Sequence, residues 1–193
     1  LASFNSGKMH NAIPRDGKVV FAVPAADKET VRADWNIFTA AVEDEFHVTD
    51  TTMEFHLEST EATPVLPKDV SRRFILAIQG IDNGVFAMCQ DEAISWLVET
   101  SSNVASIITT DNEITVVASH RSSVMSNLDN EANTVKAVFE LAGADITISD
   151  GYPAWKMNPN SKLVEVAVAS YKKLFGKAPI VKGIHAGLEC GLF

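Results

Sequence analysis

The sequence predicts an α+β fold of duplicated ferredoxin-like antiparallel sheet layers with helices on one face. Alternating apolar and polar residues predict short strands, and turn residues at 16–17 and 110–112 separate two pairs of them. Apolar residues at helical spacing predict a long helix after each pair. The order strand, turn, strand, helix, strand therefore occurs twice, and a helix over an antiparallel sheet in each copy gives this fold.

The first copy spans about residues 1–58. Strands are predicted at 1–5 and 18–23. Asp27 is the predicted N-cap of the helix, and a half-buried strand follows at 52–58. The apolar face of the helix consists of Val31, Trp35, Phe38, Val42 and Phe46.

The second copy spans about residues 69–150 and follows a polar connector that contains prolines. Residues 92–99 have no clear pattern and lead into a hairpin at 103–123. The predicted elements of this copy are a helix at 69–81, a strand at 85–89, the hairpin strands at 103–109 and 113–119, a helix at 126–142 and a strand at 144–149.

Gly151 marks the predicted domain boundary, because it opens a turn-rich segment at 151–155. A helix capped by Asn160-Ser161 follows. A strand at 180–184 then enters a glycine-containing loop at 185–191.

Composition excludes several classes of function. The net charge is −9 and no basic stripe is present, which argues against nucleic-acid binding. No apolar run approaches the roughly 20 residues of a membrane-spanning helix. Cys89 and Cys190 lie outside any zinc or redox spacing, and lone thiols fit a reducing, cytoplasmic location. The chain begins at Leu1 without methionine, in strand-like sequence, which suggests a piece of a larger protein.

Four polar side chains near the predicted hairpins are candidate binding residues. Arg121 lies at the exit of the second hairpin, where its guanidinium can hold a carboxylate through two parallel hydrogen bonds; a surface ion pair is the alternative. Asn11 lies in an extended loop, and its alternative is a turn-stabilising hydrogen bond. His10 and His120 flank these two, and each either faces a ligand or bonds locally. No histidine pair has HxxxH or HExxH spacing, so no metal site is predicted.

The loop at 185–191 is a further candidate site. It follows a predicted strand, and α/β sheets place ligands at the carboxyl ends of strands. Gly187 and Glu189 are therefore candidate substrate-binding residues, and His185 is a possible third. A loop without function is the alternative.

The last ten residues, IHAGLECGLF, resemble the signature of aminoacyl-histidine dipeptidases, which are also called Xaa-His or cytosol non-specific dipeptidases. The resemblance covers essentially the whole chain, and shorter family motifs follow in the expected order. These motifs are Asn11-Ala12-Ile13-Pro14-Arg15, Val98-Glu99-Thr100-Ser101, Asn103-Val104, Thr110-Asp111-Asn112, Arg121-Ser122, Leu141-Ala142-Gly143-Ala144, Gly151-Tyr152-Pro153 and Trp155.

The resemblance implies that the chain is part of a two-domain zinc metallopeptidase that hydrolyses Xaa-His and other dipeptides. Residues 1–151 resemble its lid domain, and residues 152–193 resemble the return into its catalytic domain. The two-metal centre of the family, with its catalytic glutamate, lies outside this chain. The resemblance therefore implies no catalytic residue and no bound metal here, and the chain alone is expected to be inactive without the missing catalytic domain.

The resemblance also implies a role for two of the candidate residues. Wider family members grip the C-terminal carboxylate of the substrate with the asparagine of an Asn-x-Ile-Pro motif and an arginine at the end of a lid strand. These positions match Asn11 in the first copy and Arg121 in the second, so one site would be divided between the copies. His10 stands where close relatives have arginine, which leaves its role open. The alternative function is a non-catalytic dimerisation module that forms a homodimer.

Overall fold

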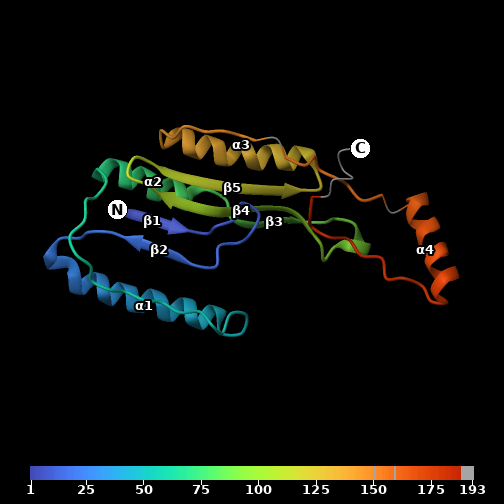
Figure 1. Cartoon of the computed structure of the whole chain (residues 1–193), viewed down its shortest axis with the longest axis horizontal. Helices are drawn as coiled ribbons and strands as arrows, with labels where there is room; N and C mark the ends of the chain where they lie inside the picture. Colours follow the sequence, from blue (N-terminus) through green and yellow to red (C-terminus); the bar gives the residue numbers. More distant parts are fainter. Residues whose placement is uncertain (150, 159, 188–193) are drawn as a thin grey trace.

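The computed structural model describes residues 1–149, 151–158 and 160–187 and shows an α+β molecule, as predicted (Figure 1). Its strands are β1 (Ser3–Ser6), β2 (Gly17–Val20), β3 (Gly84–Met88), β4 (Val98–Thr109) and β5 (Ile114–Ser122). Its helices are α1 (Lys28–Phe46), α2 (Lys68–Gly80), α3 (Met125–Leu141) and α4 (Lys162–Phe175), with 3-10 turns at Ala25–Asp27 and Glu92–Ile94. Within the described residues, no helix has both the length and the apolar character that crossing a membrane requires.

β4 is the central strand of a single antiparallel sheet. β5 pairs with one edge of β4 along nearly its whole length, from Thr100 to Thr109. β3 and β1 share the other edge, with β3 beside the first half of β4 and β1 near its end, and β2 pairs with β1. The core forms where β4 meets α3 and the end of α2. Its buried apolar residues are Ala77, Ile81, Ala105, Ile107 and Val135.

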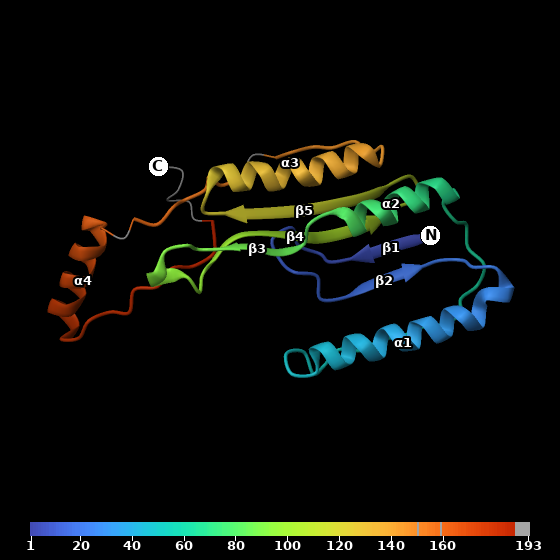
Figure 2. The same ribbon diagram turned by 180° about the vertical axis from the view of Figure 1, so that it is seen from behind.

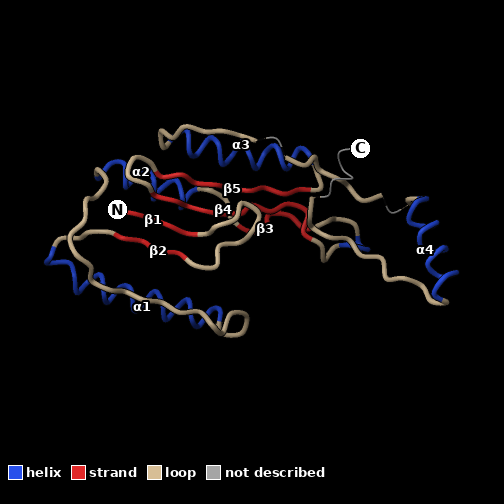
Figure 3. The backbone as a smooth tube through the Cα atoms, in the orientation of Figure 1, coloured by secondary structure: helices blue, strands red, loops and turns tan. Residues whose placement is uncertain are grey.

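Each predicted copy contains a hairpin followed by a helix, β1–β2–α1 in the first copy and β4–β5–α3 in the second. Because β1 pairs with β4, the two hairpins lie side by side with β2 and β5 outermost (Figure 3). α3 packs against β5. α1 lies beyond β2 and packs instead against the segment that follows it, where the rings of Trp35 and Phe55 meet edge to face at 6.2 Å.

The predicted strands at 52–58, 144–149 and 180–184 are wrong, because none of them is a strand in the structure. The side-chain pattern at 52–58 is nevertheless that of a strand: Met53, Phe55 and Leu57 are half-buried and the residues between them are exposed. A strand also needs a neighbouring backbone to bond with, and the sheet of the described residues supplies none here. Alternation in the sequence predicts the half-buried face correctly but cannot show that the partner is present.

Side chains as well as backbone hold the junction of β1 and β4 together. The register of the two strands contains one backbone pair, Ser6↔Ile107. Beyond it, the hydroxyl of Thr109 accepts from the Phe4 N–H and donates to the Phe4 carbonyl, both at 2.9 Å. The Asn5 amide oxygen accepts from the Thr109 N–H at 2.9 Å.

α4 lies beyond the end of the sheet, apart from the other helices, in both views of the molecule (Figures 1 and 2). It ends at Gly176, which adopts φ +69° as the left-handed residue after the last turn. Its large exposed apolar side chains include Leu163, Val166, Leu174 and Phe175.

Candidate functional site

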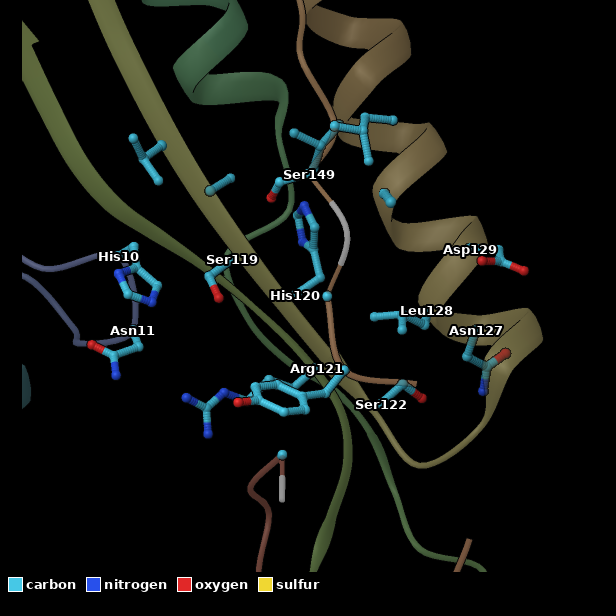
Figure 4. Close-up of a pocket in the computed structure, with 18 of the residues that line it drawn as sticks. His10, Asn11, Ser119, His120, Arg121, Ser122, Asn127, Leu128, Asp129 and Ser149 are labelled. Carbon is cyan, nitrogen blue, oxygen red and sulfur yellow. The ribbon is translucent and has the colours of Figure 1, made fainter. Parts of the chain in front are cut away.

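The two faces of the β4–β5 hairpin carry different polar groups. Side chains alternate across a strand, and directly opposed residues of an antiparallel pair share a face. Arg121 is paired with Ser101, and His120 is paired with Ser102, so the two pairs lie on opposite faces. In Figure 4 the guanidinium of Arg121 and the ring of His120 extend in different directions from β5.

A β-bulge sets this pairing. The register of β4 with β5 shifts between Val104 and Ser106, which makes Ala105 an extra residue. Counting back from the turn without this shift would place Arg121 opposite Ser102. The bulge moves the pairing by one residue and brings Ser101 to the Arg121 face.

On the Arg121 face, the chain returns from α4 and binds both strands through His185. The hydroxyl of Ser101 and Nε2 of His185 are hydrogen-bonded at 2.7 Å. Arg121 donates from Nη1 to the His185 carbonyl at 3.3 Å. Burial, and then the charge of Arg121, lowers the pKa of His185, which favours the neutral form of its imidazole. The structure thus brings together two predicted residues from the hairpin and the C-terminal loop.

Gly187 lies against Tyr152. A Cβ atom added at Gly187 would stand 3.1 Å from Cδ2 of the tyrosine, closer than ordinary van der Waals contact. Any side chain at 187 would therefore have to displace the ring. The predicted residue Glu189 lies outside the described residues.

The loop between β1 and β2 carries His10 and Asn11, and both side chains are exposed. Figure 4 shows the two residues on the side of β5 toward which Arg121 extends. The loop is bound to β4 by Asn103, whose Nδ2 donates to the carbonyl of Ala12 at 2.8 Å. Asn11 and Arg121, from different copies, thus lie on the same side of β5 (Figure 4).

His120 faces α3, on the other side of the sheet. Its Nδ1 is 3.0 Å from the Ser102 hydroxyl and 3.9 Å from Oε1 of Glu131, which is 4% exposed and has no hydrogen-bond partner for that oxygen among the described residues. Burial lowers the pKa of His120. Burial, and then the charge of Asp82, raises the pKa of Glu131. Serine and glutamate approach the same ring nitrogen, so these three groups cannot act as a nucleophilic triad, which uses both nitrogens.

An open depression of about 2740 Å³ runs along β5 and is lined from both faces of the sheet, with His120 and Arg121 among its residues. Sites that enclose a small ligand measure about 300–1,000 Å³. The described residues therefore form one wall of a site rather than a closed pocket. Within them, no group of three or more His, Cys, Asp or Glu side chains is placed to hold a metal ion.

Sequence reasoning missed Ser101, Asn103 and Glu131. Ser101 and Asn103 are two residues apart, so period-two alternation predicts that they share a face. Without the position of the bulge, the sequence does not show that this is the Arg121 face. Glu131 is an acidic residue on the α3 face that packs toward β5, and that position was its signal.

No family model matches the chain. The chain is 31% identical over 194 residues to the cytosol non-specific dipeptidase of Escherichia coli (strain K12), an alignment that covers 100% of this chain and 40% of that protein. It also matches the crystal structure of aminoacylhistidine dipeptidase from Vibrio alginolyticus, with a TM-score of 0.86 and 34% identity over 98% of this chain and 39% of the other.

These comparisons confirm the resemblance predicted from the sequence. The chain is related in sequence and in structure to dipeptidases, and it spans about two fifths of the length of each of the two proteins.

Proposed function

We propose that this dipeptidase-related chain is the lid and substrate-binding part of a metal-dependent dipeptidase that hydrolyses Xaa-His and other dipeptides. Residues 1–151 form the lid, and residues 152–193 begin the return into the catalytic domain. The exposed apolar face of α4 supports this division, because in isolation it has little to pack against. The name of the E. coli relative supports a cytosolic location.

The position of Arg121 carries the proposal. Its backbone is paired within the sheet, which limits where the guanidinium can go. Of the five N–H donors of a guanidinium, one goes to the His185 carbonyl, and a carboxylate needs two parallel ones. Arg121 therefore holds the C-terminal carboxylate of the dipeptide. A guanidinium is suited to this because it stays charged and its fork geometry matches a carboxylate.

Asn11 completes the carboxylate site from the other copy, with its side-chain amide as a hydrogen-bond donor. Gly187, which lies against Tyr152, and Glu189 are the further substrate-binding residues of this proposal. The lowered pKa of His185 favours its neutral form, so it adds a polar group without favouring a second positive charge. His10 lies beside Asn11 and is a possible further contact.

The described residues do not fit a two-zinc centre, because no cluster of three metal-ligating side chains is present among them. The zinc ions proposed for the parent enzyme belong to the three fifths of the relatives that this chain does not span. Bound there, zinc would supply the Lewis-acid chemistry that peptide-bond hydrolysis needs. The chain by itself is therefore expected to be inactive, and zinc-dependent hydrolysis of a Xaa-His dipeptide by the 193-residue chain would refute this division of labour.

Arg121→Ala in the full-length enzyme tests the carboxylate site. We expect KM for dipeptides to rise about 10- to 100-fold, since hydrogen bonds to charged groups contribute about 1.5–3 kcal/mol. Arg121→Lys keeps the positive charge but not the forked geometry of the guanidinium, so its KM should lie between those of Arg121→Ala and the wild type. With a dipeptide amide, which lacks the carboxylate, the wild type, Arg121→Ala and Arg121→Lys should have similar KM values. An unchanged kcat/KM on free dipeptides would remove Arg121 from the site.

A second function, dimerisation, is favoured by the outer face of the first copy. Ile37 and Phe38 on α1 are 71% and 58% exposed, and residues 52–58 have a strand-like side-chain pattern without a strand partner among the described residues. A second copy of the chain is the proposed partner. Light scattering of the full-length protein should show a dimer that Phe38→Glu dissociates. A protein that is monomeric at every concentration would exclude this function.

A further inference from the structure

We infer that Asn103 is a positioning residue that fixes the Asn11 loop relative to Arg121. The inference rests on the proposed function, because it concerns how the two halves of the carboxylate site are held together. Asn11 and Arg121 belong to different copies of the repeat. Some contact must therefore set the distance between them, and Asn103 makes one.

The contact is a hydrogen bond from the side-chain amide of Asn103 to the carbonyl of Ala12, at 2.8 Å. Ala12 directly follows Asn11, so the hydrogen bond fixes the backbone next to this proposed substrate-binding residue. A backbone carbonyl is present whatever side chains the loop carries. The bond therefore depends on the amide donor at position 103 alone.

The base of the same loop is fixed separately. Gly7 has φ +68°, and a Cβ atom there would stand 2.0 Å from the carbonyl oxygen of Ala105, the bulged residue of β4. The Gly7 N–H and the Ser6 hydroxyl both bond to the carbonyl of Asp16, which closes the loop on itself. The base thus rests on β4, and Asn103 holds the tip that carries Asn11.

β4 holds both loops of the proposed site on one face. Ser101 binds the His185 loop and Asn103 binds the Asn11 loop. Residues two apart on a strand are separated by about 6.6 Å along it and point the same way. The bulge begins only after Val104, so Ser101 and Asn103 lie in a regular part of the strand. The strand therefore acts as a common reference for Asn11, Arg121 and His185.

Asn103→Ala tests the inference in the full-length enzyme. We expect KM for dipeptides to rise about three- to tenfold with little change in kcat, the effect of losing one uncharged hydrogen bond. Amide hydrogen exchange at residues 9–13 should become faster in the variant, because the tip of the loop loses its contact. Asn83→Ala is the matched control, since the Asn83 side chain accepts from the N–H of Val104 and holds β4 without touching the loop.

A double-mutant cycle with Asn11→Ala separates positioning from direct contact with the substrate. If Asn103 acts through the loop, Asn103→Ala has no further effect on KM once Asn11 is replaced. Additive effects would mean that Asn103 touches the substrate itself and would overturn the positioning role. If Asn103→Ala does not fold, Asn103→Asp keeps the shape, lacks the donor and allows the same measurements.

The exchange measurement distinguishes failure of this inference from failure of the proposed function. Unchanged exchange at residues 9–13 in both Asn103 variants would overturn the inference, even if Arg121→Ala raises KM. Exchange at residues 9–13 could instead be faster in the Asn103 variants while KM is unchanged in them and in Asn11→Ala. That result would support the contact between Asn103 and the loop, and it would overturn the role of the loop in substrate binding.

Discussion

The two copies of the repeat share an order of elements but differ in how they are packed. In the second copy, β4 and β5 have 12 and 9 residues, and α3 covers β5 with Val135 buried beneath it. In the first copy, β1 and β2 have 4 residues each, and the buried residue of α1 is Thr39. The apolar residues Ile37 and Phe38 of α1 remain exposed.

This difference shows that an apolar face in a sequence predicts that a helix needs something to pack against, but does not show that the packing partner is present in the chain. Both helices carry apolar residues at helical spacing. α3 satisfies its pattern within the chain, whereas α1 covers residues 52–58 and leaves apolar side chains exposed. The second copy therefore stabilises the chain, and the first copy depends on it. The following predictions test this unequal division.

The largest expected effect comes from truncating one isoleucine in each copy. Ile107→Ala, at a residue 3% exposed in β4, should lower the free energy of unfolding by about 2–5 kcal/mol, because it leaves a cavity in the core. Ile37→Ala, at a residue 71% exposed in α1, should change it by less than about 0.5 kcal/mol. Urea unfolding of the 193-residue chain measures both. Equal costs would contradict the proposed difference between the copies.

A smaller effect is expected where the first copy meets the second. Gly7→Ala should lower the free energy of unfolding by roughly 2–4 kcal/mol, because the new methyl group meets the Ala105 carbonyl and the backbone is left-handed there. Gly176→Ala is the matched control, with φ +69° and nothing within 4 Å of the added Cβ, and should cost about 1 kcal/mol. Chemical denaturation of the two variants gives the comparison. A Gly7 variant no less stable than the Gly176 variant would show that the close approach to β4 is not needed.

The smallest expected effect concerns the buried charge of the second copy. The raised pKa of Glu131 means that the folded chain keeps this proton above pH 4.5, where the unfolded chain has lost it. Stability due to this group therefore falls as the pH rises above 4.5. Glu131→Gln should be more stable than the wild type by about 1 kcal/mol at pH 7 and equally stable below pH 4.5.

Urea midpoints at pH 4 and pH 7 measure this difference. The lowered pKa values of His120 and His185 act in the opposite direction, since the folded chain resists protonation and loses stability as the pH falls below 6.5. His185 is remote in sequence and remains in both proteins, so its contribution cancels. His120 contacts Glu131, and His120→Gln in both backgrounds removes its contribution as well. A difference that does not vary with pH would show that Glu131 has the same pKa in the folded and the unfolded chain.

The α+β class, the hairpin followed by a helix in each copy and the relationship to dipeptidases could be predicted from the sequence, because they depend on local alternation, helical spacing and motif order. The unpaired segments at 52–58 and 144–149 could not, because pairing depends on which other strands are present. Arg121 could be singled out by its chemistry, but Ser101 and Asn103 could not. One extra residue at Ala105 reverses which side of β4 faces Arg121, and no local pattern marks it. The roles of Asn11, Arg121, Gly187 and Glu189 remain predictions.

The junction of β1 and β4 has a consequence for how this molecule can vary. Backbone hydrogen bonds survive almost any substitution, because every residue except proline carries the same donor and acceptor. Here, three of the bonds that join the copies run through the side chains of Asn5 and Thr109. Single substitutions at these two positions can loosen or shift one copy against the other without disturbing either hairpin. Mutations at these positions can therefore change how the two copies are placed against each other without changing the stability of each copy.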